Sequence, residues 1–182
     1  MLAGLKRGAP PIPRTLADNL DHLTQKIDPH LLQITQAIQR THPNYSLEHF
    51  VAEVLRAVPG VTNVRVQGGP GDQGADILMV VEEGHTLTAP KATTCVVQVK
   101  SYQGHHASTG AVDDIRRAFD AYPNAGAGLI FSTGDTAGPE LEAALEKLYA
   151  DLHKPVTLII GAEMAMFILR YGAQLLSRAR MA

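Results

Sequence analysis

The chain has 182 residues, of which 45% are hydrophobic and 19% charged, and its formal net charge at pH 7 is −2. This length and composition argue against a mainly disordered chain and favour one domain with a substantial core, with or without an extension. The charge excludes a globally basic surface, although a local basic lining can still bind nucleic acid. The single cysteine excludes a disulfide framework or a cysteine-based zinc site within one chain.

The first 42 residues are predicted to form an arm followed by two helices. Residues 1–14 contain three prolines, which is typical of a flexible or extended segment. Helical spacing of apolar residues predicts a helix from Thr15, and we expect Pro29 to interrupt it before a second helix ends near Arg40. No apolar run reaches the length of a signal-peptide core or a membrane span, so we expect a cytoplasmic protein without a membrane partner.

A further helix is predicted from an N-cap at Ser46 to Ala57, with one apolar stripe along it. Glu48 lies at the edge of this stripe, whereas Glu53 falls on the polar side and is predicted to face solvent. An acid in the first turn of a helix is favoured by the helix dipole, so Glu48 has a purely structural explanation beside a functional one.

Three strands are predicted next, over residues 61–66, 76–81 and 93–100. The glycine-rich stretch 68–76 delivers Asp76 to the start of the second strand. In the third strand, side chains two positions apart share a face. Gln98 and Lys100 therefore point one way, and the valines between and before them point into a core. Because polar groups among valines need partners, we expect an acidic neighbour for Lys100, and Asp76 is the obvious candidate.

Two other motif-based interpretations are weaker. Residues 69–74 match the G-x-G-x-x-G pattern of dinucleotide-binding folds, but that mechanism needs a helix next, and residues 75–81 are typical of a strand. Cys95 lies on the core side of its strand, which favours a buried hydrophobe over a nucleophile. The adjacent His105 and His106 suit a solvated loop better than a zinc site.

Helices and strands alternate in the rest of the chain. They are a helix capped by Ser108 or Thr109, a strand over 127–131, a helix from Pro139, a strand over 156–160 and a last helix over 162–171. Three meandering strands suit antiparallel pairing, and the helical crossovers that follow suit parallel pairing. The order therefore predicts a mixed sheet covered by helices on both faces.

Two segments, 71–76 and 98–102, resemble the PD-(D/E)xK nuclease signature in its Mrr-type variant, in which glutamine replaces the second acid. The residues that carry the resemblance are Asp76, Gln98 and Lys100. The resemblance covers roughly residues 46–172. It implies an α/β fold, the restriction-endonuclease-like three-layer sandwich with a central mixed β-sheet, here with an N-terminal helical extension. The predicted domains are an arm (1–14), a helical extension (15–42), a catalytic domain (43–172) and a tail (173–182).

The resemblance also implies the active-site residues. Asp76, Gln98 and Lys100 are expected to be catalytic, and Glu48 is expected to join them from the first helix of the domain. Mg²⁺, for which Mn²⁺ can substitute, would be held by Asp76, the Gln98 side-chain oxygen and the main-chain carbonyl of Val99. Lys100 would position or activate water and stabilise charge.

Four further residues are expected to support the site or contact phosphate: Asp72, Gln73, Ser101 and Arg116. For Arg116 and Arg117 a surface role is the alternative, since Asp113 and Arg117 have the i,i+4 spacing of a helical ion pair.

The sequence leads to a metal-dependent DNA endonuclease as the first hypothesis, serving restriction or defence against foreign or modified DNA. A catalytically silent module that binds nucleic acid or protein is the alternative, favoured by Gln98 and the mildly acidic charge. A resolvase-like nuclease on branched DNA, or one acting on RNA, is the third. We expect a homodimer, because two chains most simply cut two strands, and an activating or specificity-giving partner protein stays open.

Overall fold

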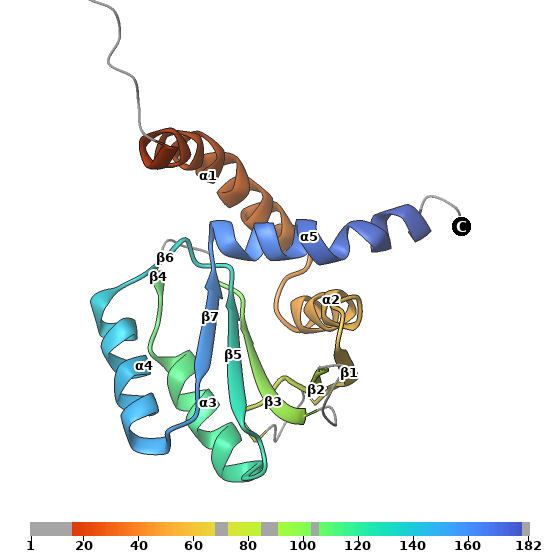
Figure 1. Cartoon of the computed structure of the whole chain (residues 1–182), viewed down its shortest axis with the longest axis vertical. Coiled ribbons are helices and arrows are strands. Elements are labelled where there is room, and N and C mark those ends of the chain that lie inside the picture. The colour runs from red at the N-terminus through yellow and green to blue at the C-terminus, as the bar shows by residue number, and fades with distance from the viewer. Residues whose placement is uncertain (1–15, 68–72, 85–90, 103–105, 180–182) are drawn as a thin grey trace, which may run out of the picture.

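The computed structural model describes residues 16–67, 73–84, 91–102 and 106–179. Figure 1 shows a central sheet with helices on both of its faces. The elements in chain order are α1 (Leu16–Thr41), α2 (Tyr45–Arg56), β1 (Val61–Val66), β2 (Ile77–Glu83), β3 (Lys91–Lys100), β4 (His106–Ala107), α3 (Gly110–Ala121), β5 (Ala127–Ser132), β6 (Thr136–Ala137), α4 (Pro139–Leu152), β7 (Val156–Ile160) and α5 (Ala162–Ala179).

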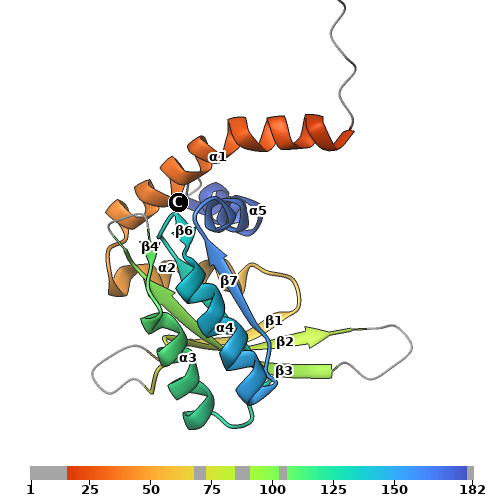
Figure 2. The same ribbon diagram turned by 90° about the vertical axis from the view of Figure 1, so that its left-hand side faces the viewer.

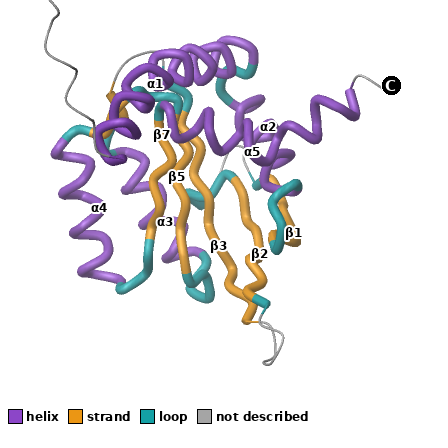
Figure 3. The backbone as a smooth tube through the Cα atoms, turned by 45° about the horizontal axis from the view of Figure 1, so that its top comes forward, coloured by secondary structure: helices purple, strands orange, loops and turns teal. Residues whose placement is uncertain are grey.

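The main sheet has the strand order β1-β2-β3-β5-β7 (Figure 3). The first three strands pair antiparallel, whereas β3, β5 and β7 are parallel to one another. Short connections join antiparallel neighbours, and the crossover helices α3 and α4 return the chain so that the next strand is parallel. The predicted mixed sheet is thus confirmed. Strands β4 and β6 form a separate two-stranded parallel sheet.

Two hydrophobic cores lie on opposite faces of the sheet, one with α2 and α5 and the other with α3 and α4. Strand β3 divides its side chains between them. Val97 and Val99 pack with residues of α2 and α5, whereas Val96 packs with residues of α3 and α4. Gln98 and Lys100 alternate with Val97 and Val99 and therefore share the α3 face. This alternation aims both polar side chains toward one helix.

The predicted break at Pro29 is wrong, because α1 is a single helix with Pro29 inside it. Figure 2 shows α1 changing direction along its length, as expected where proline removes one helical hydrogen bond. The half after Pro29 packs on α5. There Leu31 is buried and the buried Thr35 hydroxyl donates to the Gly161 carbonyl at 2.7 Å. This burial offsets the roughly 3 kcal/mol that an internal proline costs.

Two other helix boundaries also differ from prediction. The N-cap of α2 is Asn44, and the Ser46 hydroxyl donates instead to the Pro43 carbonyl at 2.9 Å. The last helix runs past the predicted end at Tyr171, since Gly172 does not stop it. A Cβ at Gly172 would lie 3.4 Å from a Val54 methyl, so this glycine permits close packing of α5 on α2.

No helix among the described residues is long and apolar enough to cross a membrane.

Cys95 lies in the core with 3% of its surface exposed, and burial raises the pKa of its thiol. Because the thiolate is the reactive form, we expect the folded protein to react with a thiol reagent such as DTNB at least about 100-fold more slowly than after denaturation. Rapid labelling of the native protein would contradict this burial.

Candidate active site

Asp76, Gln98 and Val99 meet in a buried cluster where β2 begins and β3 ends. The Asp76 Oδ2 atom accepts hydrogen bonds from Gln98 Nε2 at 2.5 Å and from the Val99 backbone N–H at 2.6 Å. Asp76 and Gln98 are only 3% and 4% exposed. An ionised carboxylate at such a depth needs donors of this kind, and here the next strand supplies them.

The backbone around Asp76 is fixed on both sides by its neighbours in the sheet. Its N–H donates to the Val97 carbonyl at 2.9 Å, and its carbonyl accepts from the Gln67 N–H at 2.7 Å. Two residues earlier, Gly74 has a φ of +86°, a conformation in which glycine is strongly favoured. A Cβ at Gly74 would lie 2.3 Å from the Asp114 carbonyl oxygen, so the loop and α3 are in direct backbone contact.

Asp76, the acidic partner predicted for Gln98 and Lys100, bonds Gln98, whereas the Lys100 ammonium pairs with Asp114 of α3. Lys100 Nζ forms an ion pair with Asp114 Oδ2, and the two side chains are 27% and 16% exposed. The reason is the strand geometry, which directs Lys100 toward α3. The sequence does indicate that Asp114 faces the sheet. It lies three residues after Ala111 and four before Ala118, and both alanines are on the buried face of the helix.

The predicted ion pair between Asp113 and Arg117 is also wrong. Arg117 pairs with Asp114 Oδ1, at i,i+3 spacing, while Asp113 is exposed. Asp114 thereby holds two cations, one on each oxygen. Arg116 turns the other way, and its guanidinium contacts Asp151 of α4 at 2.7 Å.

Burial tends to raise the pKa of Asp114, but hydrogen bonds from Lys100 and Arg117 outweigh it and lower the pKa below its ordinary value of 3.8. A carboxyl whose pKa is lowered on folding stabilises the protein above its unfolded pKa, and this stabilisation is lost as the pH falls through the folded pKa. We therefore expect Asp114→Asn to destabilise the protein at pH 6 and to have a diminishing effect below pH 3.8. Urea denaturation at both pH values measures this, and an effect that grew toward acid pH would contradict it.

The cluster has oxygen ligands that suit a hard divalent cation. Gln98 Oε1 is buried and has no hydrogen-bond partner among the described residues. The Val99 N–H and carbonyl point to the same side of the strand, so the carbonyl faces the side on which Asp76 lies. A carboxylate, an amide oxygen and a main-chain carbonyl are ligands that Mg²⁺ accepts. In the part of the chain that the structure describes, no three His, Cys, Asp or Glu side chains form a metal-binding group.

Glu48 lies in the first turn of α2, half-buried, with its Oε2 atom shielded from solvent. Its predicted part in the active site stays a prediction. Glu53 is exposed and pairs with Arg56, which confirms its predicted place on the solvated face.

The predicted supporting residues are spread over several places. Gln73 is exposed just before the Gly74 contact, and Asp72 lies outside the described residues. The Ser101 hydroxyl accepts a long hydrogen bond, 3.4 Å, from Gln39 of α1. This contact joins the N-terminal helix to the residue after Lys100.

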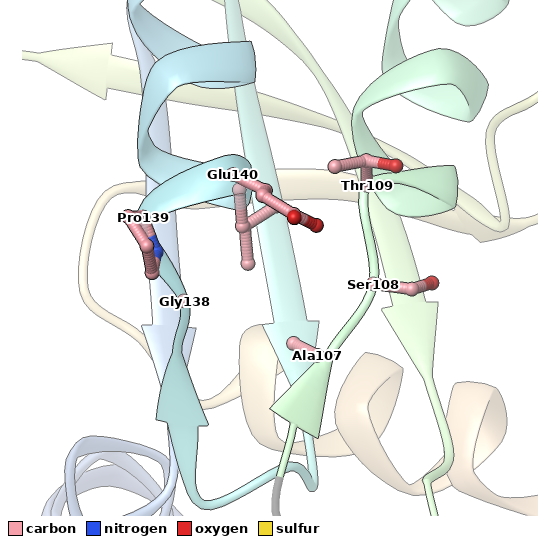
Figure 4. Close-up of a pocket in the computed structure, with 7 residues that line it drawn as sticks. Ala107, Ser108, Thr109, Gly138, Pro139 and Glu140 are labelled. Atoms are coloured by element: carbon pink, nitrogen blue, oxygen red, sulfur yellow. The ribbon is translucent and has the colours of Figure 1, made fainter.

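A separate pocket of about 420 Å³ lies where α3 and α4 begin, next to the β4–β6 pair (Figure 4). Ser108 and Thr109 line one side of it, and Gly138, Pro139 and Glu140 line the other. Figure 4 shows the Glu140 side chain extending toward the α3 side of this space. An acidic group there disfavours phosphate, so this pocket is a poor candidate for the chemistry despite its volume.

A family model described as a restriction endonuclease, Mrr_cat, matches residues 40–168. Among solved structures, the chain is similar to the DNA modification-dependent restriction endonuclease AspBHI at 17% identity and a TM-score of 0.52, over 81% of this chain and 36% of AspBHI. It is also similar to the restriction endonuclease FokI at 16% identity and a TM-score of 0.55, over 85% of this chain and 30% of FokI. The chain thus spans about a third of the length of these proteins. A search of curated proteins gave no match. These likenesses confirm the predicted α/β restriction-endonuclease-like sandwich.

Proposed function

We propose that this chain, which belongs to the restriction endonuclease family, is a metal-dependent DNA endonuclease of the Mrr-like class. One observation carries the proposal: the Asp76 carboxylate is buried beside Gln98 Oε1, which has no hydrogen-bond partner among the described residues, and Val99 and Lys100 directly follow Gln98 in β3. Burying the Gln98 oxygen without a partner is costly, so its place beside the Asp76 carboxylate is best explained by a cation that both residues bind.

Mg²⁺, or Mn²⁺ in its place, would supply a charge sink and a water of lowered pKa when held by Asp76, Gln98 and Val99. Hydrolysis then forms a bond from a water oxygen to phosphorus and breaks a phosphorus–oxygen ester bond. The water loses a proton and the departing oxygen gains one, which leaves a phosphate monoester and a hydroxyl. The Lys100 ammonium, held by Asp114, orients the water and stabilises the charge on the phosphate oxygens. Glu48 is proposed to orient a second water from α2.

A restriction or defence role is proposed on the same family likeness, and AspBHI is by name dependent on DNA modification. The chain spans about a third of that relative, so specificity for sequence or methylation is proposed to come from another domain or a partner protein. A homodimer is proposed because each chain carries one site and duplex DNA has two strands.

Oligonucleotide cleavage tests the proposal. Labelled duplex, four-way junction and single-stranded DNA, with single-stranded RNA as a further substrate, are incubated with the protein in Mg²⁺, Mn²⁺ or EDTA. We expect cleavage of duplex DNA with either metal and none in EDTA. Preferential cleavage of the junction would favour the resolvase-like alternative. Salt-dependent binding without any product would favour the silent binding module and overturn the proposal.

A further inference from the structure

Arg117 and Lys100 come from different elements, yet they share one carboxylate. Asp114 Oδ2 pairs with Lys100 and Oδ1 pairs with Arg117. The three side chains together carry one net positive charge, in a chain whose formal net charge is −2. They therefore form a small positively charged patch beside the Asp76 cluster, which would attract the phosphates of a nucleic-acid backbone.

The stem of Arg117 lies over the loop that leads to Asp76. A Cβ built at Gly74, two residues before Asp76, would lie 3.0 Å from the Arg117 Cβ. Arg117 thus approaches this loop through its Cβ and shares Asp114 with Lys100. Its side chain is 65% exposed, and only its NH2 group is bonded to Asp114. A guanidinium has five N–H donors, so several remain directed outward for a second acceptor.

We propose that Arg117 binds a backbone phosphate of DNA next to the bond that is cut, and that Asp114 positions Arg117 and Lys100 together. This inference rests on the proposed function of the Asp76 cluster. Arginine suits the role because its planar donors match phosphate, and its pairing with Asp114 limits the conformational freedom that binding would otherwise remove. Arg116, the residue named from the sequence, is held by Asp151 on α4 instead.

Adjacent arginines on one helix provide a matched pair of variants. Binding of a labelled DNA duplex is followed by fluorescence anisotropy in EDTA, over a series of KCl concentrations, for wild type, Arg117→Gln, Arg117→Lys and Arg116→Gln. We expect Arg117→Gln to bind several-fold more weakly and to lower the salt slope by about 0.9, the value for one lost phosphate contact. Arg116→Gln is expected to keep the wild-type slope, and Arg117→Lys to restore most of it.

Cleavage kinetics in Mg²⁺ separate this inference from the proposed function. If wild type cleaves duplex DNA, Arg117→Gln should raise KM more than it lowers kcat. If wild type binds and cleaves but the two glutamine variants have equal slopes and equal KM values, the role of Arg117 is overturned and the nuclease stands. If wild type binds without cleaving and only Arg117→Gln loses slope, the nuclease falls and the phosphate contact stands. If wild type neither binds nor cleaves, both are overturned.

Discussion

Lys100→Ala is expected to lower the rate of DNA cleavage at least about 100-fold while the protein stays folded. The ammonium lies at the end of β3 beside the Asp76 cluster, and no other described cation of β3 is near it. Stability should change little, because Asp114 keeps Arg117 as a partner and a partly exposed ion pair contributes about 1 kcal/mol or less. The melting temperature should therefore fall by less than about 4 °C.

Lys91→Ala is the matched control for this variant. Lys91 is exposed at the opposite end of the same strand, so its removal deletes the same charge without touching the cluster. Plasmid cleavage and thermal melting are measured for both variants. Cleavage by Lys100→Ala at the rate of Lys91→Ala would remove Lys100 from the mechanism.

Gly74→Ala is expected to have the largest effect on stability of any single methyl addition near the site. Alanine at a φ of +86° is strained, and its Cβ would lie 2.3 Å from the Asp114 carbonyl oxygen and 2.9 Å from the Ala118 nitrogen. Both are backbone atoms of α3, so they move only if the loop or the helix moves. Strain and overpacking together cost about 2–5 kcal/mol. Cleavage should fall as well, because the loop positions Asp76.

Gly84→Ala is the control, since a Cβ there meets nothing within 4 Å. Its free energy of unfolding should stay within about 0.5 kcal/mol of wild type. Urea denaturation gives both values. Equal stability of the two variants would mean that the Gly74 loop does not pack on α3 as the structure has it.

The sequence predicts the sheet and the Asp76–Gln98 cluster because local patterns define two successive strands, whose antiparallel pairing brings the two residues together. Alternation along 93–100 sets the face of Gln98 and Lys100, and the glycine-rich stretch ending at Asp76 marks the turn into β2. The partner of Lys100 was not predictable in the same way. Asp114 follows Lys100 by 14 residues, but it lies on a helix, and its place beside Lys100 depends on how α3 packs across β3.

The helix boundaries show the same limit. A proline at position 29 and a glycine at position 172 are local stop signals, yet both helices continue because their faces are buried on other helices. Tertiary packing overrides local propensity at these positions. The direction of each arginine on α3 was likewise decided by its acidic partner and not by spacing alone.

Nicking of supercoiled plasmid, methylated and unmethylated, tests most directly whether the Asp76 cluster forms a metal-dependent nuclease site. Wild type and Asp76→Ala are compared in Mg²⁺, Mn²⁺ and EDTA, with circular dichroism to verify that the variant folds. We predict nicking by wild type with either metal, none in EDTA, and none by folded Asp76→Ala. Nicking retained by Asp76→Ala, nicking that persists in EDTA, or no nicking of either plasmid by wild type would contradict the assignment.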